Sequence, residues 1–248
     1  IWHTKTVTAS RLRGRIEWVL ASATTRKLRS GLNPATWRGH LETILPKPNK
    51  IKEEEHHKAL PYQDIPEFIG KLKEMDGVAA LALEFVILNA NRTGEVIGGL
   101  RSEVNTNGLW VIPKDRMKAH REHRVPLGKR SLELLQIAKS LDPSSDYLFS
   151  YNGRALSSMA MSMLQRRMGY NITVHGFRSC FRDWVAEETI HSPEVAEKAL
   201  AHAIANKVES AYRRGDLIEH RKRLMGDWED YCQTGSWGNV VALERKAA

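Results

Sequence analysis

A histidine and an arginine stand three residues apart in the stretch His175-Gly176-Phe177-Arg178, at the start of an expected helix. At this spacing both side chains can face the same way. Histidine is the natural proton acceptor near neutral pH, and arginine offers two parallel donors to the oxygens of a phosphate. The pair can therefore bind and activate a phosphate. The alternative is a chance tetrapeptide whose phenylalanine packs into the core.

A second arginine, Arg92, follows directly after the longest apolar stretch of the chain, residues 77–90. An arginine at the end of a buried helix is rigidly placed, and Glu95, three residues further on, can orient its guanidinium through a charge-assisted hydrogen bond. Arg92 is thus a second candidate for phosphate binding. The alternative is a purely structural ion pair between Arg92 and Glu95.

A tyrosine near the C-terminal end lies in a basic setting. His202 ends one expected helix, and residues 206–209 fit a capping box at the start of the next. This second helix carries Tyr212, which two arginines follow directly. A tyrosine hydroxyl can act as a nucleophile, but by itself such a residue is more often a packed aromatic on a solvated helix.

Hydrophobic periodicity predicts the elements that must position these residues. The expected fold is mostly helical with one small antiparallel sheet, an α+β class. Helices are expected over residues 8–25 (with Ser10 as N-cap), 34–45, 64–75, 77–90, 131–141, 157–168, 177–189, 193–201, 206–214 and 216–231. Short strands are expected at 104, 110–112 and 124–127, with a tight turn over 105–108 and a longer basic turn over 113–123.

The charge of the chain is concentrated at one end. The formal net charge is +9, and residues 1–50 hold ten Lys or Arg against two acidic residues, a net of +8. A compact basic segment of this kind favours a polyanionic partner, with a solvated basic surface as the alternative. The residues we expect to contact DNA phosphates are Lys5, Arg11, Arg13, Arg15, Arg26, Lys27 and Arg29.

Changes in composition divide the chain into four parts. Residues 1–45 form a partial helical domain, and residues 46–61 are polar, charged and poor in apolar residues, as in a linker. Residues 62–232 form the main domain, and residues 233–248 a C-terminal tail. The chain begins with Ile1 instead of Met, which is consistent with a missing preceding segment.

Several classes of protein are disfavoured. Two cysteines cannot build a disulfide framework or a cysteine zinc site, and no apolar run is long enough to span a bilayer. No signal peptide is visible, so we expect a soluble protein of the cytoplasm with no membrane partner. Because a glycine-rich phosphate loop and a carboxylate cluster are both missing from the sequence, no cofactor and no metal are expected.

Six residues, taken in chain order, resemble the pattern of the tyrosine site-specific recombinases, most closely the integrases of prophages and genomic islands. They are the arginine at 92, a lysine in the basic turn, the histidine at 175 with the arginine at 178, the histidine at 202 and the tyrosine at 212. The resemblance covers residues 60–232, and residues 1–45 resemble the end of the helical core-binding domain in that family. It implies the recombinase catalytic-domain fold. The catalytic residues that it implies are Arg92, Lys118, His175, Arg178, His202 and Tyr212, with Glu95 in support.

The resemblance also implies roles and partners. Arg92 and Arg178 would clamp the phosphate, His175 would accept the proton of the nucleophile Tyr212, Lys118 would protonate the leaving group, and His202 would hydrogen-bond the phosphate. Lys118 competes with three other basic residues of the same turn. The expected partner is duplex DNA at attachment sites, bound by a homotetramer that is monomeric in isolation, with accessory DNA-bending proteins, in the bacterial cytoplasm beside the nucleoid.

Three other interpretations share part of this pattern. A type IB topoisomerase uses the same chemistry, but that family usually has a lysine where His175 stands. A DNA-binding factor without catalysis would use the basic segment alone, yet it has no reason to keep six candidate catalytic residues. Cleavage by a metal-dependent nuclease would be inhibited by EDTA, whereas cleavage by a tyrosine recombinase or a topoisomerase would not.

Overall fold

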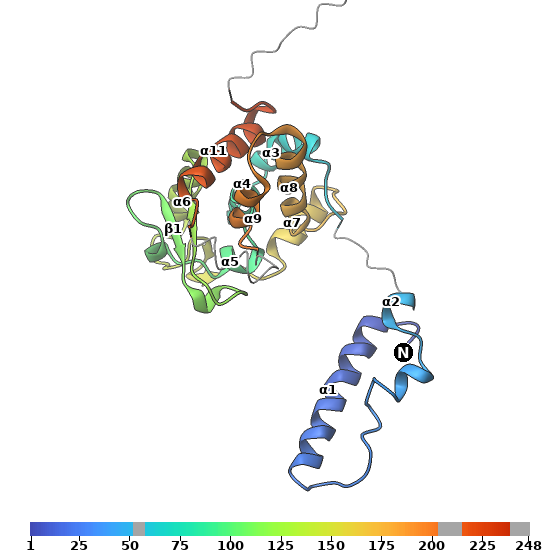
Figure 1. Ribbon diagram of the computed structural model, residues 1–248. Coiled ribbons are helices and arrows are strands. Elements are labelled where there is room, and N and C mark those ends of the chain that lie inside the picture. Colours follow the sequence, from blue (N-terminus) through green and yellow to red (C-terminus); the bar gives the residue numbers. More distant parts are fainter. Residues whose placement is uncertain (52–57, 203–214, 239–248) are drawn as a thin grey trace, which may run out of the picture. The chain divides into compact units, whose positions relative to one another are not determined.

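The computed structural model describes residues 1–51, 58–202 and 215–238 (Figure 1). The chain divides into two compact units, unit 1 from Ile1 to His56 and unit 2 from His57 to Ala248. The boundary between the units lies within residues 46–61, the segment expected to be a linker.

Unit 1 consists of one long helix and a loop that packs along one side of it. Helix α1 spans Thr6–Thr25, a 3-10 turn spans Leu41–Thr43, and the short helix α2 spans Pro48–Ile51. The expected N-cap at Ser10 is wrong, because the helix begins earlier and Lys5 occupies the capping position. The short helix expected over residues 34–45 is also wrong and is reduced to turns and the 3-10 segment.

The loop covers only part of α1. The rings of Trp2 and Trp37 stack 5.5 Å apart and the Trp2 indole donates to the carbonyl of Pro46, so these contacts tie the two ends of the unit together. The apolar stripe predicted on α1 remains largely open, with exposed fractions of 45% at Leu12 and 57% at Val19. The periodicity predicted the helix, but the stripe does not face a core within unit 1.

Unit 2 is mostly helical, as predicted. Its described helices are α3 (Ile65–Lys73), α4 (Val78–Leu88), α5 (Thr93–Ile97), α6 (Lys129–Leu141), α7 (Ala160–Arg167), α8 (Gly176–Glu188), α9 (Pro193–Ala199) and α11 (Ile218–Thr234). Its strands are β1 (Leu109–Ile112), β2 (His123–Pro126), β3 (Ser150–Tyr151) and β4 (Arg154–Ala155). Short 3-10 segments span Tyr62–Asp64, Arg101–Glu103 and Lys114–Arg116.

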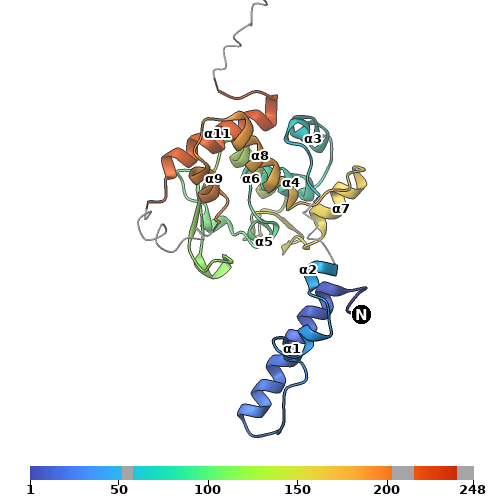
Figure 2. The same ribbon diagram turned by 45° about the vertical axis from the view of Figure 1, so that its right-hand side comes forward.

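Helix α4 is the centre of unit 2. Its sequence is apolar on nearly all faces, which predicts a helix surrounded by others, and Leu83 and Phe85 within it are fully buried. Helices α3, α6, α7 and α11 all contact it, and Figures 1 and 2 show it enclosed by the other helices. The C-terminal end of α4 is therefore fixed in a rigid core, directly before Arg92.

The predicted antiparallel hairpin is present. Strands β1 and β2 pair in a register that places Leu109 opposite Pro126 and Ile112 opposite His123, with a basic turn between them. A second hairpin, β3–β4, was not predicted. It turns at Asn152 and Gly153, both with positive φ, and this Asn-Gly pair is a recognisable hairpin signal in the sequence.

Helix α11 extends further than expected, to Thr234, and is followed by Gly235 in the left-handed conformation that often ends a helix. Trp237 then packs against Trp184 of α8, with ring centroids 5.7 Å apart. Residues 233–238 therefore pack on unit 2, although they were assigned to the tail. The apolar residues of the tail, 240–243, lie outside the described residues.

Candidate active site

Arg92 and Glu95 hold each other at the start of α5. The Glu95 carboxylate accepts from the Arg92 backbone N–H at 2.9 Å and from its guanidinium at 2.7 Å. Burial acts to raise the pKa of Glu95, but the hydrogen bonds and charge of Arg92 outweigh it, so the pKa is lowered. The ion pair expected from the sequence is present, and it leaves the Arg92 side chain 25% exposed.

Arg178 lies between the C-terminal ends of helices α4 and α9 and bonds to both. Its guanidinium donates from Nη1 to the carbonyl of Ala90, just after α4, and from Nη2 to the carbonyl of Leu200, the C-cap of α9, at 2.6 Å. The carbonyls at helix C-termini carry partial negative charge, which stabilises a cation. Both helix ends continue through a non-glycine residue with positive φ, Ala90 (49°) and Ala201 (49°).

The Arg178 side chain is nearly completely buried, with only 4% of the residue exposed. Burial, followed by the nearby positive charge of Arg92, lowers its pKa to about 10, so the guanidinium remains a cation at neutral pH. Its Nε–H is buried without a hydrogen-bond partner among the described residues. A buried cation with an unused donor, repelled by a second arginine, is suited to bind an anion.

His202 connects this arginine to α9. Its Nε2 lies 3.1 Å from Nη2 of Arg178, and its Nδ1 lies 2.6 Å from the carboxylate of Glu197. The sequence had indicated His202 but not Glu197. A spacing of five residues is not a helical i,i+4 pair, so only the turn that ends α9 brings these two side chains together.

His175 is the residue directly before α8, and its side chain is exposed. Its backbone carbonyl accepts from the N–H of Arg178 at 3.1 Å, so the two residues occupy the first turn of the same helix. The sequence expectation that this pair shares a helix start is confirmed. The catalytic role assigned to His175 stays a prediction.

The basic residues in the turn between β1 and β2 differ in their surroundings. Arg116 pairs with the carboxylate of Glu103 at 2.5 Å and also donates to the backbone carbonyl of Glu95, so it supports the start of α5. Lys118, in contrast, is exposed on the turn. Arg116 is therefore engaged in the fold, while Lys118 can reach outward from the hairpin.

Tyr212 lies outside the described residues, as does the predicted helix over 206–214. Both flanks of this segment are described. His202 precedes it at the site just described, and Gly215 follows it, with its backbone carbonyl accepting from the ammonium of Lys198 on α9. The two described ends of the segment are thus attached to the same helix.

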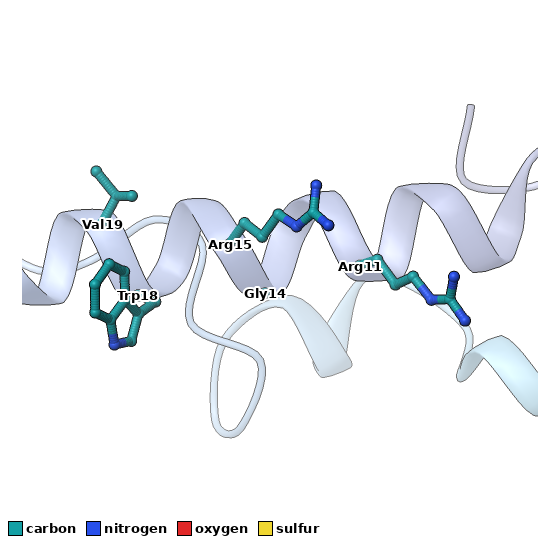
Figure 3. A pocket seen from close by; sticks show the side chains of 5 residues that line it. All are labelled: Arg11, Gly14, Arg15, Trp18 and Val19. Carbon is teal, nitrogen blue, oxygen red and sulfur yellow. The ribbon is translucent and has the colours of Figure 1, made fainter. Parts of the chain in front are cut away.

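The predicted DNA-binding residues of unit 1 differ in their surroundings. Arg13 contacts Glu17 at 2.5 Å and the carbonyl of Ala35 at 2.8 Å, so its guanidinium is engaged within the unit. Arg11 and Arg15 are exposed and share one face of α1 with Trp18, around a shallow hollow (Figure 3). Lys5, Arg26 and Lys27 are exposed as well, and Arg29 bonds to its own loop at Gly31 and Leu32.

Within residues 1–51, 58–202 and 215–238, no three His, Cys, Asp or Glu side chains come close enough to hold a metal ion. In the same residues, every helix is too short or too polar to cross a membrane.

Comparison with known proteins gives a consistent result. The prophage integrase IntA of Escherichia coli strain K12 is 31% identical over 161 residues, which cover 62% of this chain and 39% of that protein. The prophage integrase IntZ of the same strain is 29% identical over 201 residues, which cover 79% and 50%. The chain therefore spans half or less of the length of these two relatives.

Among solved structures, a lambda integrase tetramer bound to a Holliday junction superposes with a TM-score of 0.60 at 15% identity, covering 86% of this chain and 60% of that one. This likeness shows the shared fold and confirms the predicted recombinase fold. Residues 58–217 match the phage integrase family, and this stretch contains all six predicted catalytic positions. The chain therefore belongs to the phage integrase family.

Proposed function

We propose that this chain cleaves and rejoins DNA in site-specific recombination, for the integration and excision of mobile DNA, through a covalent 3′-phosphotyrosine intermediate. The observation that carries the proposal is the environment of Arg178. This cation is buried between two helix ends, and its Nε donor has no hydrogen-bond partner within the described part of the chain. Burial, and then the positive charge of Arg92, lower the pKa of its guanidinium. A phosphate would satisfy the donor and relieve the repulsion between the arginines.

The two arginines suit the charge that develops during attack on a phosphodiester. The five-coordinate transition state concentrates negative charge on the phosphate oxygens, and preorganised donors stabilise it most where water is excluded. Glu95 holds Arg92 in one orientation, and the carbonyls of Ala90 and Leu200 do the same for Arg178. Loss of one such donor typically lowers the rate about 10²- to 10³-fold.

Proton transfer assigns the remaining roles. A free tyrosine has a pKa of about 10, so only about one molecule in a thousand is ionised at pH 7. Attack by Tyr212 therefore needs a proton acceptor, for which we assign His175, and the departing 5′ oxygen needs a proton, which the exposed Lys118 can deliver. The phosphotyrosine bond conserves the energy of the broken ester, so rejoining needs neither ATP nor a metal.

DNA binding would involve both units, with residues 1–45 of unit 1 as a partial core-binding domain, residues 46–61 as a linker and residues 62–232 as the catalytic domain. The exposed Arg11 and Arg15, beside Trp18, present cations and an aromatic ring on one face of α1. We also propose a homotetramer on DNA, because a structural neighbour was solved as a tetramer on a Holliday junction. We further propose that accessory DNA-bending proteins take part and that the protein acts in the bacterial cytoplasm.

The test is to trap and identify the covalent adduct. The protein is incubated in EDTA with genomic DNA fragments from its source, and the DNA that remains attached after denaturation is sequenced to find the site. A nicked duplex of that site, from which the cleaved piece diffuses away, should then accumulate an adduct that mass spectrometry of the tryptic peptide locates on Tyr212. Replacement of this tyrosine by phenylalanine should abolish the adduct and leave DNA affinity within a few-fold.

Tyr151→Phe is the matched control, because Tyr151 is 70% exposed on β3 and the proposal gives it no role. An adduct on another residue, or none with the wild-type protein on a verified site, would overturn the proposal. Cleavage that EDTA abolishes would instead indicate a metal-dependent nuclease, and relaxation without strand exchange would indicate a topoisomerase.

A further inference from the structure

The side chain of Glu197 lies between His202 of the site and Arg182 of α8, and it binds both. Its Oε2 lies 2.6 Å from Nδ1 of His202, and its Oε1 accepts from Nε of Arg182 at 2.6 Å. Arg182 stands one turn after Arg178 on α8, whereas Glu197 is on α9. The carboxylate therefore connects the helix that carries the buried arginine to the helix end that carries His202.

The partners of His202 determine which of its ring nitrogens carries the proton. An arginine guanidinium can only donate hydrogen bonds, so the Nε2 that faces Arg178 must accept. A neutral imidazole has one N–H, and that N–H must then be on Nδ1, where it donates to Glu197. The structure thus defines one tautomer, with the Nε2 lone pair directed at the buried guanidinium.

Glu197 is charged at neutral pH, as this arrangement requires. Burial acts to raise the pKa of the carboxyl, but the hydrogen bonds and charges of His202 and Arg182 outweigh it, and the pKa is lowered. The carboxylate has 32% of its side chain exposed, so it is accessible to water, but both its oxygens are occupied by the two partners. A charged acceptor at Nδ1 favours the Nδ1–H tautomer over the alternative.

We propose that Glu197 is a positioning residue, which holds His202 in the Nδ1–H tautomer, so that Nε2 accepts from Arg178 and keeps the guanidinium in place to bind the phosphate. In this tautomer His202 acts through Arg178 and does not itself donate a hydrogen bond to the phosphate. This inference rests on the proposed function for its catalytic consequence, but the tautomer itself is a property of the free protein. The same logic governs metal-binding and catalytic histidines, in which a carboxylate on one ring nitrogen fixes the other. Arg182 holds the second oxygen of Glu197 and so limits its rotation.

The first measurement needs no DNA. Side-chain ¹⁵N–¹H correlation spectra of the free protein at pH 8, with the His202 signals assigned by their loss in His202→Gln, report which nitrogen is protonated. The wild-type protein should show His202 protonated on Nδ1. Glu197→Ala removes the acceptor at Nδ1, so the ring is no longer held against Arg178 and the signals should shift toward the Nε2–H tautomer that free histidine favours. Glu67→Ala is the matched control, because Glu67 forms an exposed ion pair with Lys71 on α3 and should leave the signals unchanged.

The second measurement is the rate of adduct formation on the trapped site. Glu197→Ala should lower this rate about 10- to 100-fold, as for other carboxylates that orient a functional imidazole. Glu197→Gln keeps an acceptor on a side chain of the same length without the charge. Its rate of adduct formation should therefore lie between those of Glu197→Ala and the wild-type protein. DNA affinity and the urea midpoint should both stay close to those of Glu67→Ala, since a general structural defect would move them too.

The outcomes separate the two proposals. An unchanged tautomer in Glu197→Ala, or an adduct rate equal to that of Glu67→Ala, would overturn the positioning role. If the wild-type protein forms no adduct on any DNA, the proposed function fails, while the spectra still decide whether Glu197 sets the tautomer.

Discussion

Nη1 of Arg221 lies 2.7 Å from Oδ1 of Asp216, and this contact fixes the chain just before α11. Arg221 is only 1% exposed, and its Nη2 also donates to the backbone carbonyl of Arg124 in β2. Asp216 stands four residues after Tyr212 in the sequence. The pair therefore anchors to the hairpin one end of the segment that carries the proposed nucleophile.

Replacing Asp216 by alanine leaves a buried guanidinium without its carboxylate. We expect the free energy of unfolding to fall by about 1–3 kcal/mol, as for other buried donors that lose a partner. Adduct formation should also slow, because the segment after Tyr212 loses an attachment. Urea unfolding and the adduct assay measure the two effects. Asp230→Ala, at an exposed position on α11, should change neither, and equal behaviour of the two variants would contradict this interpretation.

Lys118 should act as the proton donor to the leaving oxygen. Lys118→Ala is expected to lower the cleavage rate about 10²- to 10⁴-fold, the usual contribution of a general acid. A substrate in which the leaving oxygen is replaced by sulfur needs no such proton, because a thiolate leaves readily, and should restore the rate. Lys114→Ala tests the other lysine of the turn and should cleave the normal substrate at nearly the wild-type rate. If Lys114→Ala is the variant that sulfur rescues, the assignment is wrong.

The affinity for DNA should depend on salt through the exposed arginines of α1. Each phosphate contact adds about 0.9 to the slope of log K against log salt. Arg11→Gln and Arg15→Gln should each reduce the magnitude of this slope by about that amount, and the double variant by about twice as much. Fluorescence anisotropy titrations at several salt concentrations measure the slope. An unchanged slope in the double variant would show that other residues supply the phosphate contacts.

His123 should make the protein less stable in mild acid. Burial, followed by the positive charge of Arg221, lowers its pKa from 6.5 to about 4. Between these values the unfolded chain binds a proton that the folded chain does not, so stability falls as the pH falls through this window. The contribution is about 2 kcal/mol between pH 7 and pH 5.

Between pH 7 and pH 5, the free energy of unfolding of His123→Gln should therefore fall by about 2 kcal/mol less than that of the wild type. Urea unfolding at both pH values measures this difference. His120→Gln, at an exposed position in the same hairpin, is the control and should lose as much as the wild type. The same loss in His123→Gln would show that other groups cause the acid sensitivity.

Glu229 of α11 caps the beginning of α6. Its carboxylate accepts from the backbone N–H groups of Arg130, at 2.9 Å, and Ser131, at 3.3 Å, where the helix dipole favours negative charge. Glu229→Gln should lower the free energy of unfolding by about 1–2 kcal/mol, the usual effect of a lost cap. Asp230→Asn, exposed on the same helix and outside its first turn, should be nearly neutral in the same urea titration. Similar midpoints for both variants would show that the cap contributes little.

The periodicity of the sequence predicted most helices of unit 2 and the β1–β2 hairpin, because these elements depend on contacts between near neighbours. It was less reliable in unit 1. Ser10 is a good capping residue, but the helix continues through it to Thr6, since tertiary contacts bury Thr6 and Ala9. The second hairpin was missed although Asn152-Gly153 signals it, because strands of two residues carry no periodic pattern.

The candidate site shows the same division. The sequence by itself determined that His175 stands within one helical turn of Arg178, and Arg92 within one turn of Glu95, because a spacing of three residues is local. It also supplied the order of the candidate catalytic residue types, on which the resemblance to the recombinases depends. These features are local, and local spacing is what a sequence records directly.

Only the tertiary structure decided what surrounds them. Arg178 is bonded to Ala90, 88 residues away, and to His202, 24 residues away. Such contacts follow from the packing of α4, α8 and α9 around a shared core, which no local pattern encodes. The role of Glu197 also depends on tertiary structure. The turn after α9 brings His202 back toward α9, where its Nδ1 contacts the Glu197 carboxylate, and this contact sets the tautomer of His202.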